Sequence, residues 1–253
     1  MVIYSESTLN VLMVHEDPCI RVVKQVEALT KLGVCVDLLC KRIESHPGIQ
    51  KFVRTIYKYK DYFDLRGFLE ANQEVWDVIH AHNEPNCLIA VTIAACSKRP
   101  VVYDCHDMTS ARSRIHGVEA DIERYCFENC AAVVHVSSGI KDIAFKKYGP
   151  KLSIVMPSFP VITLQNFPPK KKLEGIHVVY QGGVVDSTTT KYSYRYYLPM
   201  FERICEEGIN VHIFPAPTIQ RGALHGYLAL HKKNNFFHIH ESLPYGRLIE
   251  EMG

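Results

Sequence analysis

The chain has 253 residues and a formal net charge of +2, with 47% hydrophobic and 22% charged residues. This composition supports a folded core and excludes a disordered chain, and the small net charge excludes nucleic acid as a general partner. The start, MVIYSESTLN, lacks the basic and apolar regions of a secretion signal. The longest apolar run, CLIAVTIAAC, has roughly half of the ~20 residues that a membrane-spanning helix needs. The nine cysteines are scattered through segments typical of buried strands and helices. We therefore expect a cytoplasmic protein with reduced cysteines, whose basic clusters allow peripheral membrane contact at most.

In the N-terminal part, apolar strands alternate with helices. NVLMVH, which starts at Asn10, predicts a buried strand, and it is followed by the loop HEDP, a helix over 19–33 and the strand CVDLLCK. Asp17 is expected to cap this helix, with Pro18 at its first position and Gly33 just past its end. The loop has no G-x-G-x-x-G pattern, so no nicotinamide or flavin cofactor is predicted.

The same alternation continues to residue 158. Further strands are predicted at 52–58, 76–82, 101–107, 131–138 and 151–158, and further helices at 60–76, 84–98, 117–130 and 139–149. Helical crossovers between successive strands require a parallel sheet. The pattern predicts a doubly wound α/β domain.

The segment FPVITLQNFPPKKKLEG is rich in proline, has three consecutive lysines and shows no apolar period, which is typical of a linker. We predict an N-terminal domain over 1–160, a linker over 161–175 and a C-terminal domain over 176–253. In the latter, strands are predicted at 176–185, 210–216 and 236–242, and helices at 193–208, 221–234 and from 245 onward. Three strands leave the edges of a sheet open, so we expect the second domain to be incomplete.

Polar side chains end two strands of the first domain, in WDVIHAHN and RPVVYDCHDM. Ligands of open α/β sheets bind outside the carboxyl ends of the strands, so these positions are candidates for chemistry. They are His80, His82, Asn83, Asp104, His106 and Asp107. His106 could donate a hydrogen bond to a substrate while a neighbouring carboxylate fixes its tautomer, although a structural histidine would also fit.

His80 and His82 lie two residues apart, hence on one face of a strand, as in an H-x-H metal pair. Asp104 or His106 could complete such a site. Packed or hydrogen-bonded histidines explain the same pattern, and we predict that no metal is bound.

The glycine turn QGGV follows the first strand of the second domain. Gly182 and Gly183 would let backbone N–H groups approach a phosphate, and Arg195 and Lys191 are cations available for a diphosphate. A plain tight turn with solvated helix charges is the competing interpretation.

Taken in order, DVIHAHN, PVVYDCHD, CFENCAAVVHVSSGI, KLSIVMPS and VVYQGGV resemble retaining glycosyltransferases of family four, which have the two-domain B-type fold. The resemblance covers nearly the whole chain from Asn10. It implies two Rossmann-like, doubly wound parallel-sheet domains. It also implies transfer of a sugar from a nucleotide diphosphate donor, bound mainly by the second domain, to a carbohydrate or lipid-linked acceptor held by the first. Neither a metal nor a cofactor is implied, because basic side chains and a helix terminus stabilise the leaving diphosphate.

By position, the resemblance also implies residue roles. Gly182, Gly183 and Arg195 would lie near the donor phosphates with Lys191 as a second cation, and His106 would contact the donor sugar. The acceptor-side residues would be Asp17, Arg21, His82 and Asn83. The family's pair of glutamates would lie beyond Gly253, so the chain by itself is expected to be an inactive fragment.

Three other functions stay open at this point. A nucleotide-sugar epimerase on the same fold would need carboxylate acid and base groups at the cleft. A non-catalytic module could hold a glycan or a partner on the first domain. A metal-dependent hydrolase could be built on His80, His82 and His106.

Overall fold

The structure is a computed structural model that describes residues 8–43, 46–83, 85–111, 117–158, 174–186, 193–216 and 224–243. The chain divides into two compact units, Met1–Pro160 (unit 1) and Val161–Gly253 (unit 2), and each is described by itself. Lys191, the helix predicted from 245 onward and most of the predicted linker lie outside the described residues. No described helix combines the length and apolar character that crossing a membrane requires.

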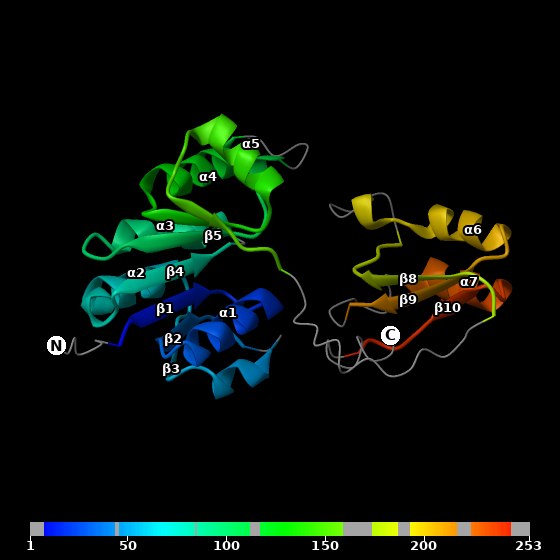
Figure 1. Ribbon diagram of the computed structural model, residues 1–253, viewed down its shortest axis with the longest axis horizontal. Coiled ribbons are helices and arrows are strands. Elements are labelled where there is room, and N and C mark those ends of the chain that lie inside the picture. The colour runs from blue at the N-terminus through cyan, green and yellow to red at the C-terminus, as the bar shows by residue number, and fades with distance from the viewer. Residues whose placement is uncertain are drawn as a thin grey trace, which may run out of the picture. The chain divides into compact units, whose positions relative to one another are not determined.

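Unit 1 is built on a seven-stranded parallel sheet in the order β3-β2-β1-β4-β5-β6-β7 (Figure 1). The strands are β1 (Asn10–His15), β2 (Cys35–Cys40), β3 (Thr55–Lys58), β4 (Val78–His82), β5 (Val101–Cys105), β6 (Ala132–His135) and β7 (Ser153–Val155). The helices are α1 (Ile20–Lys31), α2 (Tyr62–Asn72), α3 (Asn86–Ala95), α4 (Val118–Asn129) and α5 (Ser138–Tyr148), with 3₁₀ turns η1 (Pro47–Lys51), η2 (Gln73–Val75) and η3 (Thr109–Ala111). This is the predicted doubly wound domain, with somewhat shorter elements.

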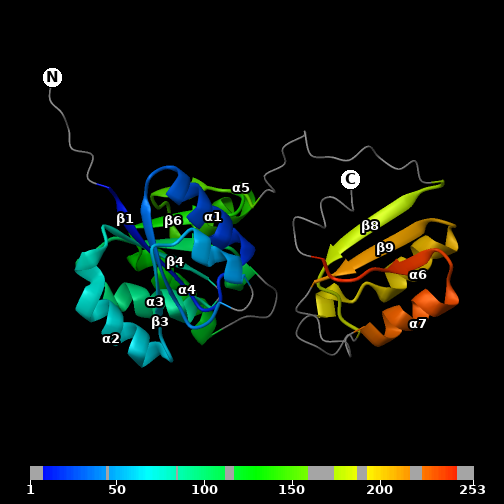
Figure 2. The same ribbon diagram turned by 90° about the horizontal axis from the view of Figure 1, so that it is seen from below.

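Helices cover both faces of this sheet (Figures 1 and 2). On one face, Val22 and Val26 of α1 pack against Met13 and Leu38 of the strands. Their spacing of four residues places both valines on one side of the helix. On the other face, α2, α3, α4 and α5 enclose the larger core. α3 is apolar on nearly every side because it lies between α2 and α4 as well as on the sheet.

The start of α1 differs from the prediction. The N-cap residue is Cys19, not Asp17, and its side chain makes no capping hydrogen bond. The carboxylate of Asp17 instead pairs with Arg42 at 3.4 Å. Pro18 disfavours helical backbone in the residue before it, so the loop stays extended for longer than predicted. The other end agrees with the prediction, because Gly33 follows the C-cap with a φ of 82°.

Unit 2 contains a three-stranded parallel sheet in the order β10-β9-β8 (Figure 1). The strands are β8 (His177–Gly182), β9 (Asn210–Pro215) and β10 (Phe237–Ile239), and the helices are α6 (Leu198–Glu206) and α7 (His225–Lys233), with the 3₁₀ turn η5 (Ser193–Arg195). Phe201 of α6 and Tyr227 of α7 pack against Val211, Ile213 and Phe237 of the sheet. These elements match the alternation predicted for residues 176–242.

Histidines stack on the opposite face of this small sheet. His212 lies between Val211 and Ile213 in β9, and alternation along the strand turns its side chain away from the helices. Its ring stacks against His238 and His177, with 4.5 and 5.1 Å between ring centroids.

His177, His212 and His240 form a chain of hydrogen bonds. Nε2 of His177 donates to the carbonyl of Glu174, Nδ1 of His177 shares a hydrogen bond with Nε2 of His212, and Nδ1 of His212 shares one with Nε2 of His240, each at 2.9 Å. In each bond between two rings, the ring that accepts is neutral. Burial first, and then the charges of His238, His240 and His177, lowers the pKa of His212 to about 4.

We predict that the free energy of unfolding of unit 2 falls as the pH is lowered from about 6.5 to about 4. An unfolded histidine takes up its proton near pH 6.5, whereas folded His212 does so near pH 4, so the unfolded state binds more protons in this interval. Solvent screening keeps the loss to about 1 kcal/mol. Urea unfolding followed through the NMR signals of β9, at the two ends of this pH range, would measure it.

Two variants test whether His212 causes this pH dependence. His212→Gln should remove most of this pH dependence, while His225→Gln, at an exposed position of α7, should leave it unchanged. The same pH dependence in wild type and in His212→Gln would contradict the prediction.

Candidate functional site

The strand order of unit 1 changes direction between β1 and β4. β1 leads through α1 to β2 on one side, whereas β4 leads through α3 to β5 on the other. Chains that leave neighbouring strands in opposite directions open a crevice at the carboxyl ends, where doubly wound proteins bind ligands. β1 ends there at His15, β4 at His82 and β5 at Cys105, so Asn83 and His106 follow directly.

Asp104 lies at the centre of this edge and is fully buried. Its Oδ1 accepts a hydrogen bond from Arg21 Nε at 3.0 Å, and its Oδ2 accepts from Gln25 Nε2 at 2.6 Å and from His80 Nε2 at 3.2 Å. Burial acts to raise the pKa of Asp104, but the hydrogen bond from His80 and the charges of the surrounding histidines outweigh it and hold the pKa well below its usual range. Asp104 is therefore an ionised acceptor that joins α1, β4 and β5.

Arg21 supplies the opposite charge from below the surface. Its side chain is buried, and its Nη1 donates to the carbonyl oxygen of Met156 at 2.7 Å. Its Nη2 has no hydrogen-bond partner among the described residues. Sequence reasoning gave Arg21 an acceptor-side role, whereas in the structure it neutralises Asp104 and connects α1 to the segment after β7.

His82 and His106 are in direct contact. Nδ1 of His82 is 3.1 Å from Nε2 of His106, and this Nε2 is also 3.4 Å from Oδ1 of Asp104. His82 is fully buried, with Nε2 3.3 Å from Sδ of Met13, and its ring stacks on His80 at 4.5 Å, as expected for one face of a strand. Burial lowers the pKa of both His82 and His106, which favours neutral rings.

Asn83 fixes the backbone that carries His106. Its Oδ1 accepts the backbone N–H of His106 at 2.7 Å, and its Nδ2 donates to the carbonyl of Asp107 at 2.6 Å. Asn83 and His82 both have no solvent exposure, and both contact His106.

Glu123 holds the next part of the same loop. It is fully buried in α4 and accepts hydrogen bonds from the backbone N–H of Ser110 at 3.0 Å and from the hydroxyls of Ser110 and Tyr148. Sequence reasoning missed Glu123 and Gln25, because a single polar residue within a helix carries no motif. It also missed the contact that Cys19 makes with the site.

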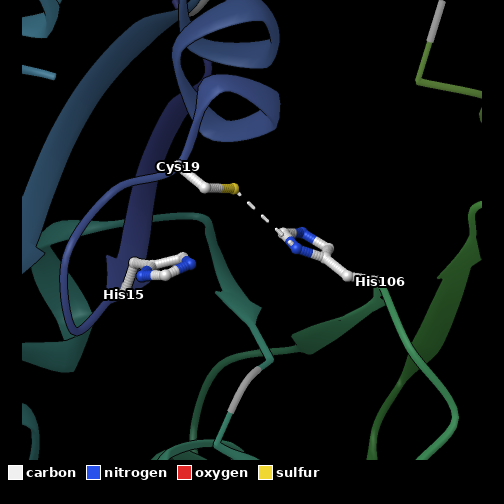
Figure 3. Close-up of side chains that lie close together, drawn as sticks. All are labelled: His15, Cys19 and His106. Atoms are coloured by element: carbon white, nitrogen blue, oxygen red, sulfur yellow. Dashed lines mark hydrogen bonds between the residues drawn. The ribbon is translucent and has the colours of Figure 1, made fainter. Parts of the chain in front are cut away.

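Three side chains form the outer edge of the site, as Figure 3 shows: His15 at the end of β1, Cys19 at the start of α1 and His106 after β5. Sγ of Cys19 is 3.8 Å from Nδ1 of His106, whose side chain is 17% exposed. Burial first, and then the neighbouring His106, lowers the pKa of His15 to about 4. Within the described residues, the groups that bring three metal-ligand atoms within 4.8 Å of one another are this one and His80, His82 and Asp104.

In unit 2, the structure brings together the glycine turn and Arg195. Gly182 ends β8 with a φ of 146°, and a Cβ atom placed on Gly183 would lie 2.7 Å from Nη1 of Arg195. The carbonyl of Arg195 accepts the backbone N–H of Val185 at 3.2 Å, and the hydroxyl of Tyr180 donates to the carbonyl of Gly183 at 2.8 Å. Glycine is therefore needed at 183 for the guanidinium to lie against the turn.

The sequence of residues 20–157 matches the family model described as Glycosyltransferase Family 4. No curated protein matches the chain in sequence.

Solved structures match it in fold. HepE of Anabaena in complex with UDP-glucose is 10% identical with a TM-score of 0.69, and the match covers 96% of this chain and 71% of that one. Sucrose-phosphate synthase of Thermosynechococcus elongatus is 13% identical with a TM-score of 0.66, covering 96% and 73%. UDP-GlcNAc 2-epimerase of Neisseria meningitidis bound to UDP-GlcNAc is 11% identical with a TM-score of 0.63, covering 95% and 74%. At these identities the likeness shows the two-domain fold that transferases and epimerases share.

We predict that Asp104→Asn destabilises unit 1 by about 3–5 kcal/mol, because it leaves the buried guanidinium of Arg21 without its counter-charge. Asp37→Asn is the matched control. Asp37 is also fully buried and pairs with Arg54 at 2.6 Å, but the Arg54 side chain is 45% exposed and can be hydrated. Urea unfolding followed by the fluorescence of Trp76 would give the free energy of unfolding of each variant. An equal loss of this free energy in the two variants would contradict the prediction for Asp104.

Proposed function

Because the chain belongs to glycosyltransferase family 4, we propose that it transfers a sugar from a nucleotide diphosphate donor to an acceptor with retention of configuration. The observation that carries the proposal lies in unit 2, where the guanidinium of Arg195 packs against Gly183 at the end of the first strand. A cation and a glycine turn in this position suit a diphosphate.

The proposed donor contacts follow from the chemistry of a diphosphate. Its oxygens accept hydrogen bonds, and a guanidinium offers several donors with a fixed charge. Gly183 lets that guanidinium lie close to the turn, where a larger residue would displace it. In the solved structures of HepE and of the Neisseria epimerase, the bound molecules are UDP-glucose and UDP-GlcNAc. A uridine diphosphate donor is therefore the first choice for a test.

His106 is the residue of unit 1 that we assign to the donor sugar. Its ring is partly exposed, and burial lowers its pKa, so it stays neutral and can exchange hydrogen bonds with a sugar hydroxyl. Asn83 fixes its backbone, and His82 and Asp104 lie beside its Nε2. Such support keeps a binding side chain in one orientation.

We also propose that the acceptor is a carbohydrate or a lipid-linked carbohydrate, and that transfer needs neither a metal nor a cofactor. Arg195 offers the positive charge that another enzyme would draw from a metal ion. The proposed acceptor-side residues are Asp17, Arg21, His82 and Asn83, and the carboxylate of Asp17 pairs with the half-exposed Arg42. Addition of EDTA should accordingly leave transfer unchanged.

The epimerase alternative receives less support from the site. An epimerase needs a carboxyl group that can exchange protons with its substrate. Asp104 is instead buried, paired with Arg21, and has a pKa held well below its usual range. Glu123 is also buried, and both of its carboxylate oxygens accept hydrogen bonds from Ser110 and Tyr148.

We predict that Arg195→Ala weakens UDP binding by about 1.5–3 kcal/mol, the range for hydrogen bonds to charged groups, which is about a ten- to hundredfold higher Kd. Calorimetric titration of the full chain with UDP, with and without EDTA, would measure this. The matched control is Arg203→Ala, since Arg203 is an exposed residue of α6 that pairs with Glu206 and Glu207. Equal UDP affinities in wild type and Arg195→Ala would exclude the proposed role.

His106→Ala should weaken binding of the sugar without affecting binding of the nucleotide. We expect UDP to bind as in wild type, while binding of the matching UDP-sugar weakens by about 1 kcal/mol, or roughly fivefold, because one hydrogen bond to the sugar is lost. Competition titration with UDP-glucose and UDP-GlcNAc would measure both affinities. Loss of UDP and UDP-sugar binding to the same extent would remove His106 from the sugar site.

A further inference from the structure

The outer edge of the site contains a set of three metal-ligand side chains, of which the proposed transfer uses only His106. His15, Cys19 and His106 come from three different elements, and their ligand atoms lie within 4.8 Å of one another. Nitrogen and sulfur are the donors that zinc takes in proteins, whereas magnesium and calcium prefer oxygen.

We propose that His15, Cys19 and His106 bind one zinc ion, with water completing a four-coordinate site. Zinc sites with three protein ligands and one open position are a recurring type. Figure 3 shows the three side chains converging on a shared space. The proposal rests on this geometry alone and does not depend on the proposed transfer.

The distances suit a zinc ion without large movements. Zn–S and Zn–N bonds of about 2.3 and 2.0 Å at a tetrahedral angle place the sulfur and nitrogen about 3.5 Å apart. Sγ of Cys19 and Nδ1 of His106 are 3.8 Å apart. In the metal-free protein the thiol proton of Cys19 points to this nitrogen, and zinc would take its place as that proton leaves to solvent.

His106 already has the environment of a metal ligand. Its Nε2 is 3.4 Å from Oδ1 of Asp104 and 3.1 Å from Nδ1 of His82, so the ring proton lies on Nε2 and the lone pair on Nδ1 faces Cys19. A carboxylate behind a ligating histidine is the usual arrangement of zinc proteins, because it fixes the tautomer and raises the basicity of the ligand.

His15 must give up one contact on binding. Its Nδ1 accepts the backbone N–H of Asp17 at 3.1 Å. Ligation through Nδ1 uses the lone pair that accepts this hydrogen bond, and ligation through Nε2 requires the ring proton to move to Nδ1. Either choice therefore breaks the bond, and the loop between β1 and α1 has to adjust.

The second set, His80, His82 and Asp104, is unsuited to the same role. The carboxylate of Asp104 already accepts hydrogen bonds from Arg21 and Gln25, and the guanidinium of Arg21 would repel a cation placed there. His82 has no solvent exposure, so water could not complete the coordination. The outer set, by contrast, keeps Cys19 and His106 partly exposed and gives an ion a route of entry.

A nucleophilic role of Cys19 with His106 as its base is the competing use of the same pair. Nucleophilic cysteines have a lowered pKa, whereas burial raises the pKa of Cys19. A raised pKa favours the protonated thiol, whereas a bound metal would supply the charge that stabilises a thiolate.

Cobalt titration of the reduced, full-length chain tests the proposal, because cobalt(II) substitutes for zinc and reports its ligands by absorption. We expect one equivalent of cobalt to give a thiolate-to-cobalt charge-transfer band and the visible bands of a four-coordinate ion, and zinc to displace both. Cys19→Ser should abolish the charge-transfer band. Serine is also a good N-cap residue, so this variant keeps the start of α1.

Matched variants test whether the charge-transfer band comes from Cys19 or from another cysteine. Cys35→Ser should leave the spectrum unchanged, because Cys35 is a half-buried cysteine at the start of β2, at the opposite edge of the sheet. His106→Gln and His15→Asn should each weaken cobalt binding more than about tenfold. Absence of the band in wild type, or its persistence in Cys19→Ser, would overturn the proposal, and far-UV circular dichroism would verify that each variant is folded.

Discussion

The buried ion pair between Asp104 and Arg21 is the interaction on which the site of unit 1 depends. An ionised carboxylate inside a protein is unstable unless it has both a counter-charge and hydrogen bonds. Arg21 supplies the charge, and Gln25 and His80 supply further hydrogen bonds. Since Arg21 and Gln25 belong to α1, the pair also fixes the start of that helix against β5. The positions of Cys19 and of the loop from β1 follow from this attachment.

Burial is the main influence on the histidines beside Asp104. It lowers the pKa of His82 and His106, which favours neutral rings next to the ion pair that Arg21 forms with the carboxylate. In unit 2, burial lowers the pKa of His212, whose two ring nitrogens form hydrogen bonds with His177 and His240. In both units, burial is thus the first cause that lowers the pKa of a histidine within a hydrogen-bonded cluster.

Much of the fold could be predicted from the sequence, because the spacing of apolar residues and the residues at turns act over short stretches of the chain. The alternating elements of both units, the doubly wound order and the position of Gly33 agree with the prediction. The site was harder to predict, since its bonds join residues that no local pattern connects. The pairing of Gln25 with Asp104 spans 79 positions, and that of Arg21 with the carbonyl of Met156 spans 135. The cap at Cys19 was missed for a related reason: the pairing of Asp17 with Arg42 forms only in the folded chain.

His106 connects the two proposals made for unit 1. Its Nε2 is held between His82 and Asp104, which leaves Nδ1, beside Cys19, as the atom available to a ligand. A sugar hydroxyl and a zinc ion would both need the lone pair or the hydrogen-bonding capacity of that single nitrogen, and a neutral ring suits either one. The two ligands therefore exclude each other at this atom. If both bind, zinc inhibits sugar binding. The inhibition occurs at Nδ1 of His106, which is available to a ligand because Nε2 of the same ring faces Asp104.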